Sequence, residues 1–302
     1  MIVSINPTYY CNFRCDFCYL TEQQLSDRTL LPLTVLESRI KEIQEIDEIQ
    51  MIDLYGGEVG LLPETYVNEL CSLLKNNGID DINIITNLSM VNQVIRNPDF
   101  YLTVSYDFDC REQSERVWTN MALLDREFSI LILASDCLIK KDIDLMINQL
   151  NLLGNLQSVE IKPYSTNQAN CHNVSNLDFE NFVKGWIQST IKKKFEFVNE
   201  TNINKTLNYK RNAFSNDHVY ITPSGEFAVL EFDLNDNEYF KLVNSYKEYK
   251  DWADNEPLKN VSNVCKSCTY YGRCLTEHYR YVKNLDYSCN GFKGLIDWYA
   301  TR

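Results

Sequence analysis

Six short apolar segments, each followed by an amphipathic stretch, constrain the fold of this 302-residue chain more than any other feature. The segments are rich in Ile and Val, as strands buried on both faces of a sheet are. Six alternations of strand and helix predict an α/β fold with a parallel sheet and right-handed crossovers. The predicted strands are Ile2–Asn6, Met51–Tyr55, Ile82–Thr86, Tyr101–Ser105, Ser129–Ala134 and Ser158–Pro163.

The stretches between these strands carry helical patterns. A helix is expected to begin near Leu62, with Pro63 in its first turn, where proline is favoured. We expect the six units to form an open, partial (β/α)6 barrel of the TIM-like type, with its ligand site at the C-terminal ends of the strands. One helical face collects Val35, Leu36, Ile40, Ile43 and Ile46. The remaining predicted helices are Arg111–Leu124, Lys141–Leu152 and Leu177–Lys193.

Three cysteines, Cys11, Cys15 and Cys18, follow the first predicted strand in a CxxxCxxC pattern. Three thiolates on one loop can hold three irons of a [4Fe–4S] cluster, which normally takes four cysteines. The fourth iron would then be open to a substrate or cofactor. Taken alone, the triplet could also be a zinc site without its fourth ligand, or a chance spacing.

The triplet and its place after the first strand resemble the radical S-adenosylmethionine (SAM) superfamily. The resemblance implies that the open iron binds the amino and carboxylate groups of SAM. It implies that one-electron reduction then releases a 5′-deoxyadenosyl radical, which takes hydrogen from C–H bonds too strong for acid–base chemistry. It also implies that Tyr19, the residue after the third cysteine, lies near the adenine.

Two later segments resemble motifs of the same family. Gly56-Gly57-Glu58, after the second strand, is similar to the GGE motif. There the glycines let the backbone approach the ligand closely, and the carboxylate pairs with the SAM ammonium group. Thr86-Asn87 ends the third strand, where the family often has Thr-Asn-Gly, and Leu88 replaces that glycine.

The end of the fourth strand resembles a Ser-x-Asp…Arg stretch of the peptide-modifying branch. The resemblance implies that Ser105 contacts the SAM ribose and that Arg116 contacts the SAM carboxylate. The alternatives are a polar contact at the strand end for Ser105 and a surface position for Arg116. Asp107 could equally cap the next segment.

The pattern changes near residue 195. The Asn-rich segment Asn199–Asn208 is predicted to be a linker. A hairpin is predicted after it, with strands at His218–Thr222 and Phe227–Phe232 around a turn at 223–226. We therefore divide the chain into a partial barrel of residues 1–200 and a small α+β domain of residues 205–302.

Four cysteines of the second predicted domain could bind zinc or an iron–sulfur cluster: Cys265, Cys268, Cys274 and Cys289. Their spacing resembles the SPASM and twitch extensions of radical SAM enzymes, which hold auxiliary [4Fe–4S] clusters. Where the full SPASM pattern has another cysteine, this chain has His278, and the hairpin contains no cysteine. The resemblance therefore implies one auxiliary [4Fe–4S] cluster on these four cysteines. His278 is an ordinary helix residue, a substrate contact or an unusual ligand.

Further cysteines lie outside these two groups. Cys71 is predicted to be a core residue on an apolar helix face. Cys110 and Cys137 follow the fourth and fifth strands, and are candidate catalytic residues, as radical-relay thiols or hydrogen donors, with a buried inert thiol as the default. Lys162 and Tyr164 end the sixth strand, where they could face a substrate.

The composition excludes several function classes. A net charge of −13 disfavours nucleic acid as the main substrate, because such a surface repels phosphate backbones. We find no secretory signal and no apolar run long enough for a membrane span. Eleven cysteines without a signal peptide indicate a cytoplasmic protein with reduced thiols, several of them on metal.

These observations favour an enzyme that abstracts hydrogen from a ribosomally made peptide, leading to a cross-link, a thioether or an epimerised α-carbon. The alternatives are dehydrogenation or epimerisation of a small molecule, such as a sugar or aminocyclitol, and a non-catalytic Fe–S redox protein. The expected partners are a peptide substrate and an electron donor such as flavodoxin or ferredoxin. Because the first strand begins at Ile2, we expect a separate leader-binding protein or leader contacts from the barrel itself.

Overall fold

A computed structural model describes residues 1–163, 174–209, 218–230, 240–260, 263–274, 289 and 291–302. All six predicted strands are present, and each pairs in parallel with the next. Their alternate residues pack outward against the helices, as the continuous apolar pattern predicts. The strands are β1 (Ile2–Ile5), β2 (Met51–Leu54), β3 (Ile82–Thr86), β4 (Tyr101–Ser105), β5 (Phe128–Ala134) and β6 (Leu156–Pro163).

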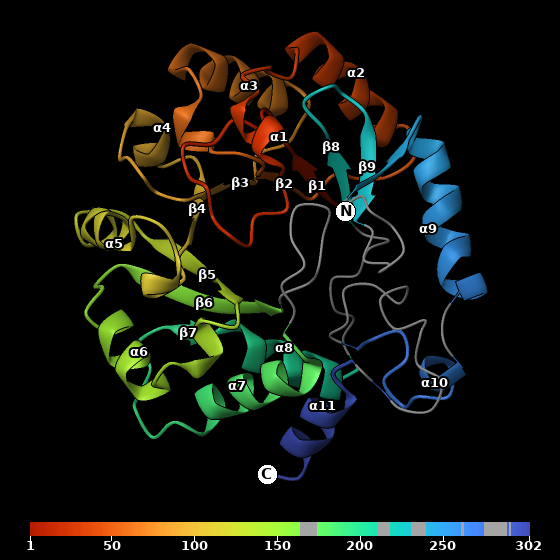
Figure 1. The fold of residues 1–302 in the computed structure, drawn as a ribbon. Helices are drawn as coiled ribbons and strands as arrows, with labels where there is room; N and C mark the ends of the chain where they lie inside the picture. The colour runs from red at the N-terminus through yellow and green to blue at the C-terminus, as the bar shows by residue number, and fades with distance from the viewer. Residues whose placement is uncertain (164–173, 210–217, 231–239, 261–262, 275–288, 290) are drawn as a thin grey trace.

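Helices follow the strands around the outside of the sheet (Figure 1). Pro63 is the N-cap of its helix rather than part of the first turn, and the helix begins at Glu64. Three short 3-10 turns, η1 (Val59–Leu61), η2 (Phe108–Cys110) and η3 (Leu138–Lys140), follow β2, β4 and β5. The helices of this half are α1 (Glu22–Ser26), α2 (Leu33–Gln44), α3 (Glu64–Asn76), α4 (Gln93–Arg96), α5 (Ser114–Ala122), α6 (Ile143–Leu150) and α7 (Asn176–Gln188).

The sheet has ten strands in the order β10-β9-β8-β1-β2-β3-β4-β5-β6-β7. The predicted hairpin, β8 (His218–Ile221) and β9 (Phe227–Leu230), is antiparallel, and β8 also pairs in parallel with β1. The later strand β10 (Phe240–Val243) pairs with β9, and β7 (Glu196–Phe197) pairs with β6 at the other edge. The architecture is therefore an open (β/α)6 barrel whose sheet continues into the C-terminal part of the chain.

The predicted linker at Asn199–Asn208 is wrong, because this segment forms helix α8 (Val198–Leu207). Ile203 and Thr206 on this helix are completely buried, and the helix packs against β6 and α11 (Lys293–Ala300). Asn199 accepts a hydrogen bond from the backbone N–H of Ile161 and donates one to its carbonyl, both 2.8 Å. Asn199 therefore pairs with backbone groups of β6, a contact that composition alone does not predict.

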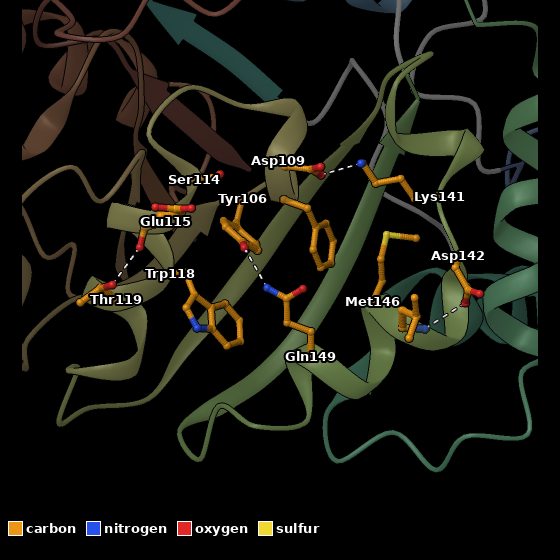
Figure 2. Close-up of a pocket in the computed structure, with 12 residues that line it drawn as sticks. Tyr106, Asp109, Ser114, Glu115, Trp118, Thr119, Lys141, Asp142, Met146 and Gln149 are labelled. Carbon is orange, nitrogen blue, oxygen red and sulfur yellow. Dashed lines mark hydrogen bonds and ion pairs between the residues drawn. The ribbon is translucent and has the colours of Figure 1, made fainter.

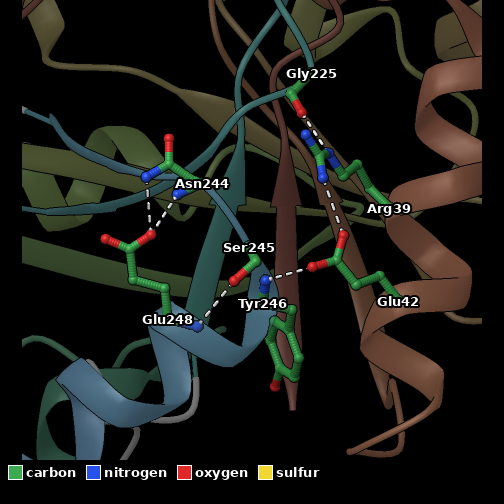
Figure 3. A network of polar contacts seen from close by, with 7 residues as sticks. All are labelled: Arg39, Glu42, Gly225, Asn244, Ser245, Tyr246 and Glu248. Carbon is green, nitrogen blue, oxygen red and sulfur yellow. Dashed lines mark hydrogen bonds and ion pairs between the residues drawn. The ribbon is translucent and has the colours of Figure 1, made fainter.

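Polar contacts from α2 attach the C-terminal elements to the barrel (Figure 3). Arg39 donates to the carbonyl of Gly225, in the turn between β8 and β9, over 2.7 Å, and pairs with Glu42 at 2.9 Å. Glu42 accepts from the backbone N–H of Tyr246, also 2.7 Å, at the start of α9 (Tyr246–Asn260). One ion pair on α2 thus holds two C-terminal segments at once.

Two further features complete the description of the fold. A short helix, α10 (Asn263–Lys266), contains Cys265, the first of the C-terminal cysteines. Within the described residues, no helix is both long enough and apolar enough to cross a membrane.

Candidate active site

The loop after β1 carries the three N-terminal cysteines and is closed on itself. The backbone N–H of Cys11 donates to the carbonyl of Leu25 over 3.1 Å, so the two ends of the loop meet. Thr21 and Gln24 form a capping box that begins α1 directly after the last cysteine, and Leu25 is buried. The short helix therefore fixes the loop at the C-terminal ends of the parallel strands.

The thiols of this loop form a donor set that suits a cluster. Cys11, Cys15 and Cys18 are half-buried and none is in a disulfide. The Sγ of Cys11 accepts the backbone N–H of Phe13 at 3.4 Å, the kind of N–H···S contact that stabilises a metal-bound thiolate. Burial raises the pKa of the Cys11 thiol to about 11 and that of Cys15 to about 12. The metal-free thiols are therefore protonated at neutral pH, and metal binding must displace their protons.

The two glycines after β2 pack against the cysteine loop. Gly57 donates its N–H to the carbonyl of Thr8 at 3.0 Å, and Glu58 donates to that of Tyr10 at 2.8 Å. A Cβ atom at Gly57 would lie 2.2 Å from the carbonyl oxygen of Tyr10, so only glycine fits there. The close approach is thus to the loop that carries the cysteines.

Glu58 is buried and its carboxylate is held by groups of the protein. Oε1 accepts from the N–H of Gly60 at 2.7 Å and from the hydroxyl of Thr86 at 2.5 Å, and Oε2 accepts from the N–H of Asn87 at 2.7 Å. Burial raises the pKa of Glu58, while these hydrogen bonds oppose the rise. In this structure the enclosed carboxylate joins the loops after β2 and β3, and its pairing with the SAM ammonium group stays a prediction.

Asn87 connects the end of β3 to the first cysteine. Its side-chain Nδ2 lies 3.6 Å from the Sγ of Cys11 and donates to the Oδ1 of Asn12 at 3.1 Å. The next residue, Leu88, is completely buried with a φ of 51°, in the left-handed region. Leucine therefore adopts the backbone conformation expected of the glycine it replaces, and its side chain is packed in the core.

The two site residues predicted at the end of β4 and beyond it, Ser105 and Arg116, differ in their exposure to solvent. Ser105 is half-buried at the end of β4, whereas Arg116 is exposed on α5 and donates to the side chain of Gln113 over 3.2 Å. The arginine that reaches the cysteine loop is Arg111, with its Nη1 4.0 Å from the Sγ of Cys15. Arg111 was not among the residues predicted for the site. The signal available was its position four residues after Asp107, a spacing that permits an ion pair.

An aromatic cluster lies beside the cysteine loop. Tyr19 stacks on Tyr55 with ring centroids 5.8 Å apart, and both pack with Tyr9 around Tyr220 of β8. Tyr55 follows β2 and Tyr220 belongs to the hairpin, so three segments distant in sequence form this aromatic cluster. Tyr19 is half-buried, in a position compatible with its predicted contact to a flat ring.

The face of the sheet opposite the helices carries several hydrogen-bonding side chains. Asn83 of β3 donates to Asp53 of β2 at 2.8 Å and accepts from the hydroxyl of Thr103 of β4 at 3.1 Å. Lys162, near the end of β6, pairs with Glu160 at 3.0 Å. The predicted neighbour Tyr164 lies outside the described residues, as do Cys171 and His278. The barrel interior thus offers hydrogen-bonding groups along several strands.

The family comparison agrees with this arrangement. Residues 5–104 match the family model described as the Radical SAM superfamily. That segment runs from β1 to β4 and includes the cysteine triplet, the Gly-Gly-Glu segment and Thr86-Asn87. The N-terminal part of the chain therefore matches the radical SAM superfamily. The match supports an enzyme of the radical SAM class.

Solved structures of similar fold cover nearly the whole chain. The structure of anSMEcpe with bound AdoMet has a TM-score of 0.71 at 14% identity, covering 99% of this chain and 96% of that one. The anSMEcpe structure with AdoMet and a Cp18Cys peptide has a TM-score of 0.69, again at 14% identity, covering 99% of this chain and 96% of that chain. SuiB from Streptococcus suis bound to the precursor peptide SuiA has a TM-score of 0.63 at 15% identity, covering 94% and 73%. At these identities the likeness shows the fold. No curated protein matches the chain in sequence.

The two candidate catalytic thiols, Cys110 and Cys137, are joined to each other. Cys110 and Cys137 form a disulfide that links the turns η2 and η3. The prediction of reduced thiols is therefore wrong for this pair, and the proposed hydrogen-donor role fails in this state because a disulfide carries no S–H hydrogen. Cys71 is half-buried against the core, close to its predicted environment.

A hollow of about 530 Å³ lies beside this disulfide, between α5 and α6 (Figure 2). Tyr106 and Trp118 form part of its floor, and Gln149 donates to the hydroxyl of Tyr106 at 3.2 Å. Lys141 and Asp109 form an ion pair of 2.6 Å at its rim. Tyr106, the residue after β4, lines this hollow, whereas Ser105 does not.

The four C-terminal cysteines lie close enough to influence one another. Burial, together with the charges of Cys289, Cys274 and Cys268, raises the pKa of the Cys265 thiol to about 11. Cys268 accepts the N–H of Tyr270 at 3.4 Å, and Cys289 that of Gly291 at 3.2 Å. These N–H···S contacts repeat the pattern seen at Cys11.

Among the described residues, no three His, Cys, Asp or Glu side chains converge as ligands of a single metal ion. A [4Fe–4S] cluster distributes its ligand sulfurs over separate irons, so this finding does not test a cluster at either cysteine group.

Proposed function

We propose that this radical SAM enzyme cleaves SAM reductively and abstracts hydrogen from a ribosomally synthesised peptide. The observation that carries the proposal is the closed loop bearing Cys11, Cys15 and Cys18, held by the segments after β2 and β3 at the C-terminal ends of the strands. This is the edge at which α/β barrels bind their ligands. The products we consider are a cross-link, a thioether or an epimerised α-carbon.

Cys11, Cys15 and Cys18 would hold a [4Fe–4S] cluster with one open iron, next to SAM. When bound, this pair of groups supplies a 5′-deoxyadenosyl radical. The residues of the chain would position these two groups and enclose them. Gly57 and Glu58 hold the loop, Asn87 donates toward the Sγ of Cys11, and Tyr19 and Tyr55 provide a flat surface beside it.

The remaining SAM contacts are proposed as follows. Gly56, Gly57, Thr86 and Asn87 border the ligand through their backbone, and Ser105 offers its hydroxyl at the end of β4. Arg116 would have to leave its exposed position beside Gln113 to reach SAM, so we assign it no contact in this state. Glu58 holds the loops that carry these residues through its hydrogen bonds.

A peptide substrate is supported by two observations. Solved structures of similar fold include complexes with a Cp18Cys peptide and with the precursor peptide SuiA. The barrel interior carries hydrogen-bonding side chains on β2, β3, β4 and β6, and backbone amides of a peptide can pair with such groups. We also propose a flavodoxin or ferredoxin as electron donor, and leader recognition by a separate protein or by the barrel.

We propose that residues 205–302 form a SPASM- or twitch-like domain with one auxiliary [4Fe–4S] cluster on Cys265, Cys268, Cys274 and Cys289. The mutual influence of these thiols and their N–H···S contacts support this assignment. With four protein ligands the cluster would have no open iron, which favours electron transfer or a structural role over substrate binding.

Iron analysis tests the two-cluster proposal. The reconstituted wild type should contain about eight irons per chain, and triple Ser variants of the N-terminal group should contain about four. Quadruple Ser variants of the C-terminal group should also contain about four. Cys71→Ser is the matched control, because Cys71 belongs to neither group, and it should keep eight. About twelve irons, or four irons with zinc, would overturn the assignment.

Isotope transfer tests the peptide proposal. A short peptide encoded beside the gene, made with deuterium at its carbon positions, is incubated with the enzyme, SAM and dithionite. Deuterium should appear in 5′-deoxyadenosine, and the peptide should change mass. Transfer from a deuterated sugar or aminocyclitol, but from no peptide, would favour the small-molecule alternative.

A further inference from the structure

Arg111 is a buried cation that our assignment of the cluster and SAM residues does not use. Its Nε and Nη2 contact the Oδ2 of Asp107 at 2.7 and 2.6 Å. Asp107 is completely buried, and its Oδ1 accepts the backbone N–H of Leu133 at 2.6 Å. The ion pair is therefore anchored to β5, and the guanidinium has one fixed orientation.

The remaining edge of the guanidinium faces the cysteine loop. Nη1 lies 4.0 Å from the Sγ of Cys15, and the guanidinium carbon lies 5.0 Å from the ring centre of Phe17. The Arg111 side chain is only 12% exposed, so water screens its charge weakly. Asp107 binds the opposite edge, which leaves the positive end of the ion pair nearer to the sulfur.

We propose that Arg111 is a positioning residue of the cluster site, acting as a charged N–H donor to the Cys15 thiolate and making a cluster on this loop easier to reduce. The inference rests on the proposed function. Charge and hydrogen bonds to the cysteine sulfurs set the reduction potential of an iron–sulfur cluster. A cluster that takes up one electron gains negative charge, which a nearby guanidinium stabilises. The electron comes from a low-potential donor, which is dithionite in the test.

The test compares Arg111→Gln, Arg111→Lys and Asp107→Asn with wild type. Arg96→Gln is the matched control, because Arg96 forms an exposed ion pair with Asp125 far from the loop in sequence. Each protein is reconstituted, its iron is counted, and its cluster is titrated with dithionite under electron paramagnetic resonance without SAM. Thermal unfolding of the metal-free proteins checks that each variant folds. The four C-terminal cysteines are also replaced by Ser in each of these proteins. The titration then reports the N-terminal cluster alone.

For Arg111→Gln we expect wild-type iron and an approximately tenfold lower ratio of reduced to oxidised cluster at a fixed potential. For one electron this corresponds to about 59 mV. Arg111→Lys keeps the charge but loses the planar fork, so its decrease should be smaller. Asp107→Asn removes the opposing carboxylate, so its ratio should rise. If Arg111→Gln fails to fold, the opposite shifts of the other two variants still decide.

Equal reduction potentials in the wild type and in every folded variant with its full iron content would overturn this inference but leave the proposed function standing. A shift in Arg111→Gln no larger than that in Arg96→Gln would do the same. Absence of iron from the wild-type loop would instead overturn the proposed function, and this inference with it.

Discussion

The backbone N–H of Asn87 donates to the Oε2 of Glu58 over 2.7 Å, joining the loop after β3 to the loop after β2. The same asparagine extends its side chain to 3.6 Å from the Sγ of Cys11. One buried carboxylate therefore fixes the position of a residue that contacts the first cysteine. This relationship makes Glu58 a support of the site from behind.

Replacing Glu58 by Gln should destabilise the metal-free protein. Glu58 accepts three hydrogen bonds, and an amide nitrogen in place of one oxygen would face a donor. An unsatisfied buried donor costs about 1–3 kcal/mol. Urea unfolding measures this loss, with Glu69→Gln on the exposed face of α3 as control. A Glu58→Gln variant as stable as wild type would show that the carboxylate does not hold the two loops.

The Cys110–Cys137 disulfide should be detectable by alkylation. Denatured but unreduced metal-free protein should take up two fewer alkyl groups than reduced protein, which has eleven thiols. Mass spectrometry of the intact chain gives both counts. Because the bond closes a separation of 27 residues, the double Ser variant should lose roughly 3–4 kcal/mol in the chain-entropy model. Equal alkyl counts before and after reduction would contradict the bond.

Helix α8 should depend on Asn199. Its side chain makes two hydrogen bonds to the backbone of Ile161 in β6. Asn199→Ala should lower the free energy of unfolding by about 1–3 kcal/mol, because backbone groups of β6 lose their partners. Lys205→Ala, on the exposed side of the same helix, should change it little. Chemical denaturation measures both, and equal small effects would argue against this attachment.

The pH dependence of stability should reveal Asp297 beside the C-terminal cysteines. Lys293 and the hydroxyl of Tyr270, 2.8 Å away, hold the pKa of Asp297 below its usual value. A lowered pKa stabilises the fold above the unfolded value of about 3.9, and this contribution disappears as the pH falls through the folded value. Both charged side chains are nearly half exposed, so the contribution is roughly a few tenths of a kcal/mol.

Asp297→Asn in the metal-free protein tests this point. The variant should be less stable than wild type at pH 6, and the difference should shrink below about pH 4. A difference that stays constant or grows toward acid pH would contradict the ion pair.

The strands of the barrel could be predicted because they are continuous apolar runs, and the cysteine groups because their spacing is local. Helix α8 could not, because its polar sequence gains its order from Ile203 and Thr206 in the core and from the contact of Asn199 with β6. Such contacts join residues distant in the chain, so the pattern of residues within one short segment does not predict them.

The site was predicted less completely for the same reason. The motif predicted a ligand contact for Glu58, but it could not predict that Glu58 is buried and accepts three hydrogen bonds from the protein. Arg111 was missed because only the fold brings it to Cys15. The pairing of Cys110 with Cys137 depends on the adjacency of β4 and β5, which places two turns side by side.

The formation of 5′-deoxyadenosine tests the central claim most directly. The reconstituted protein is incubated without oxygen with SAM and dithionite, and the product is measured by liquid chromatography and mass spectrometry. The account predicts 5′-deoxyadenosine from the wild type and none above background from Cys15→Ser. A wild-type protein with its full iron content that forms no 5′-deoxyadenosine would contradict it.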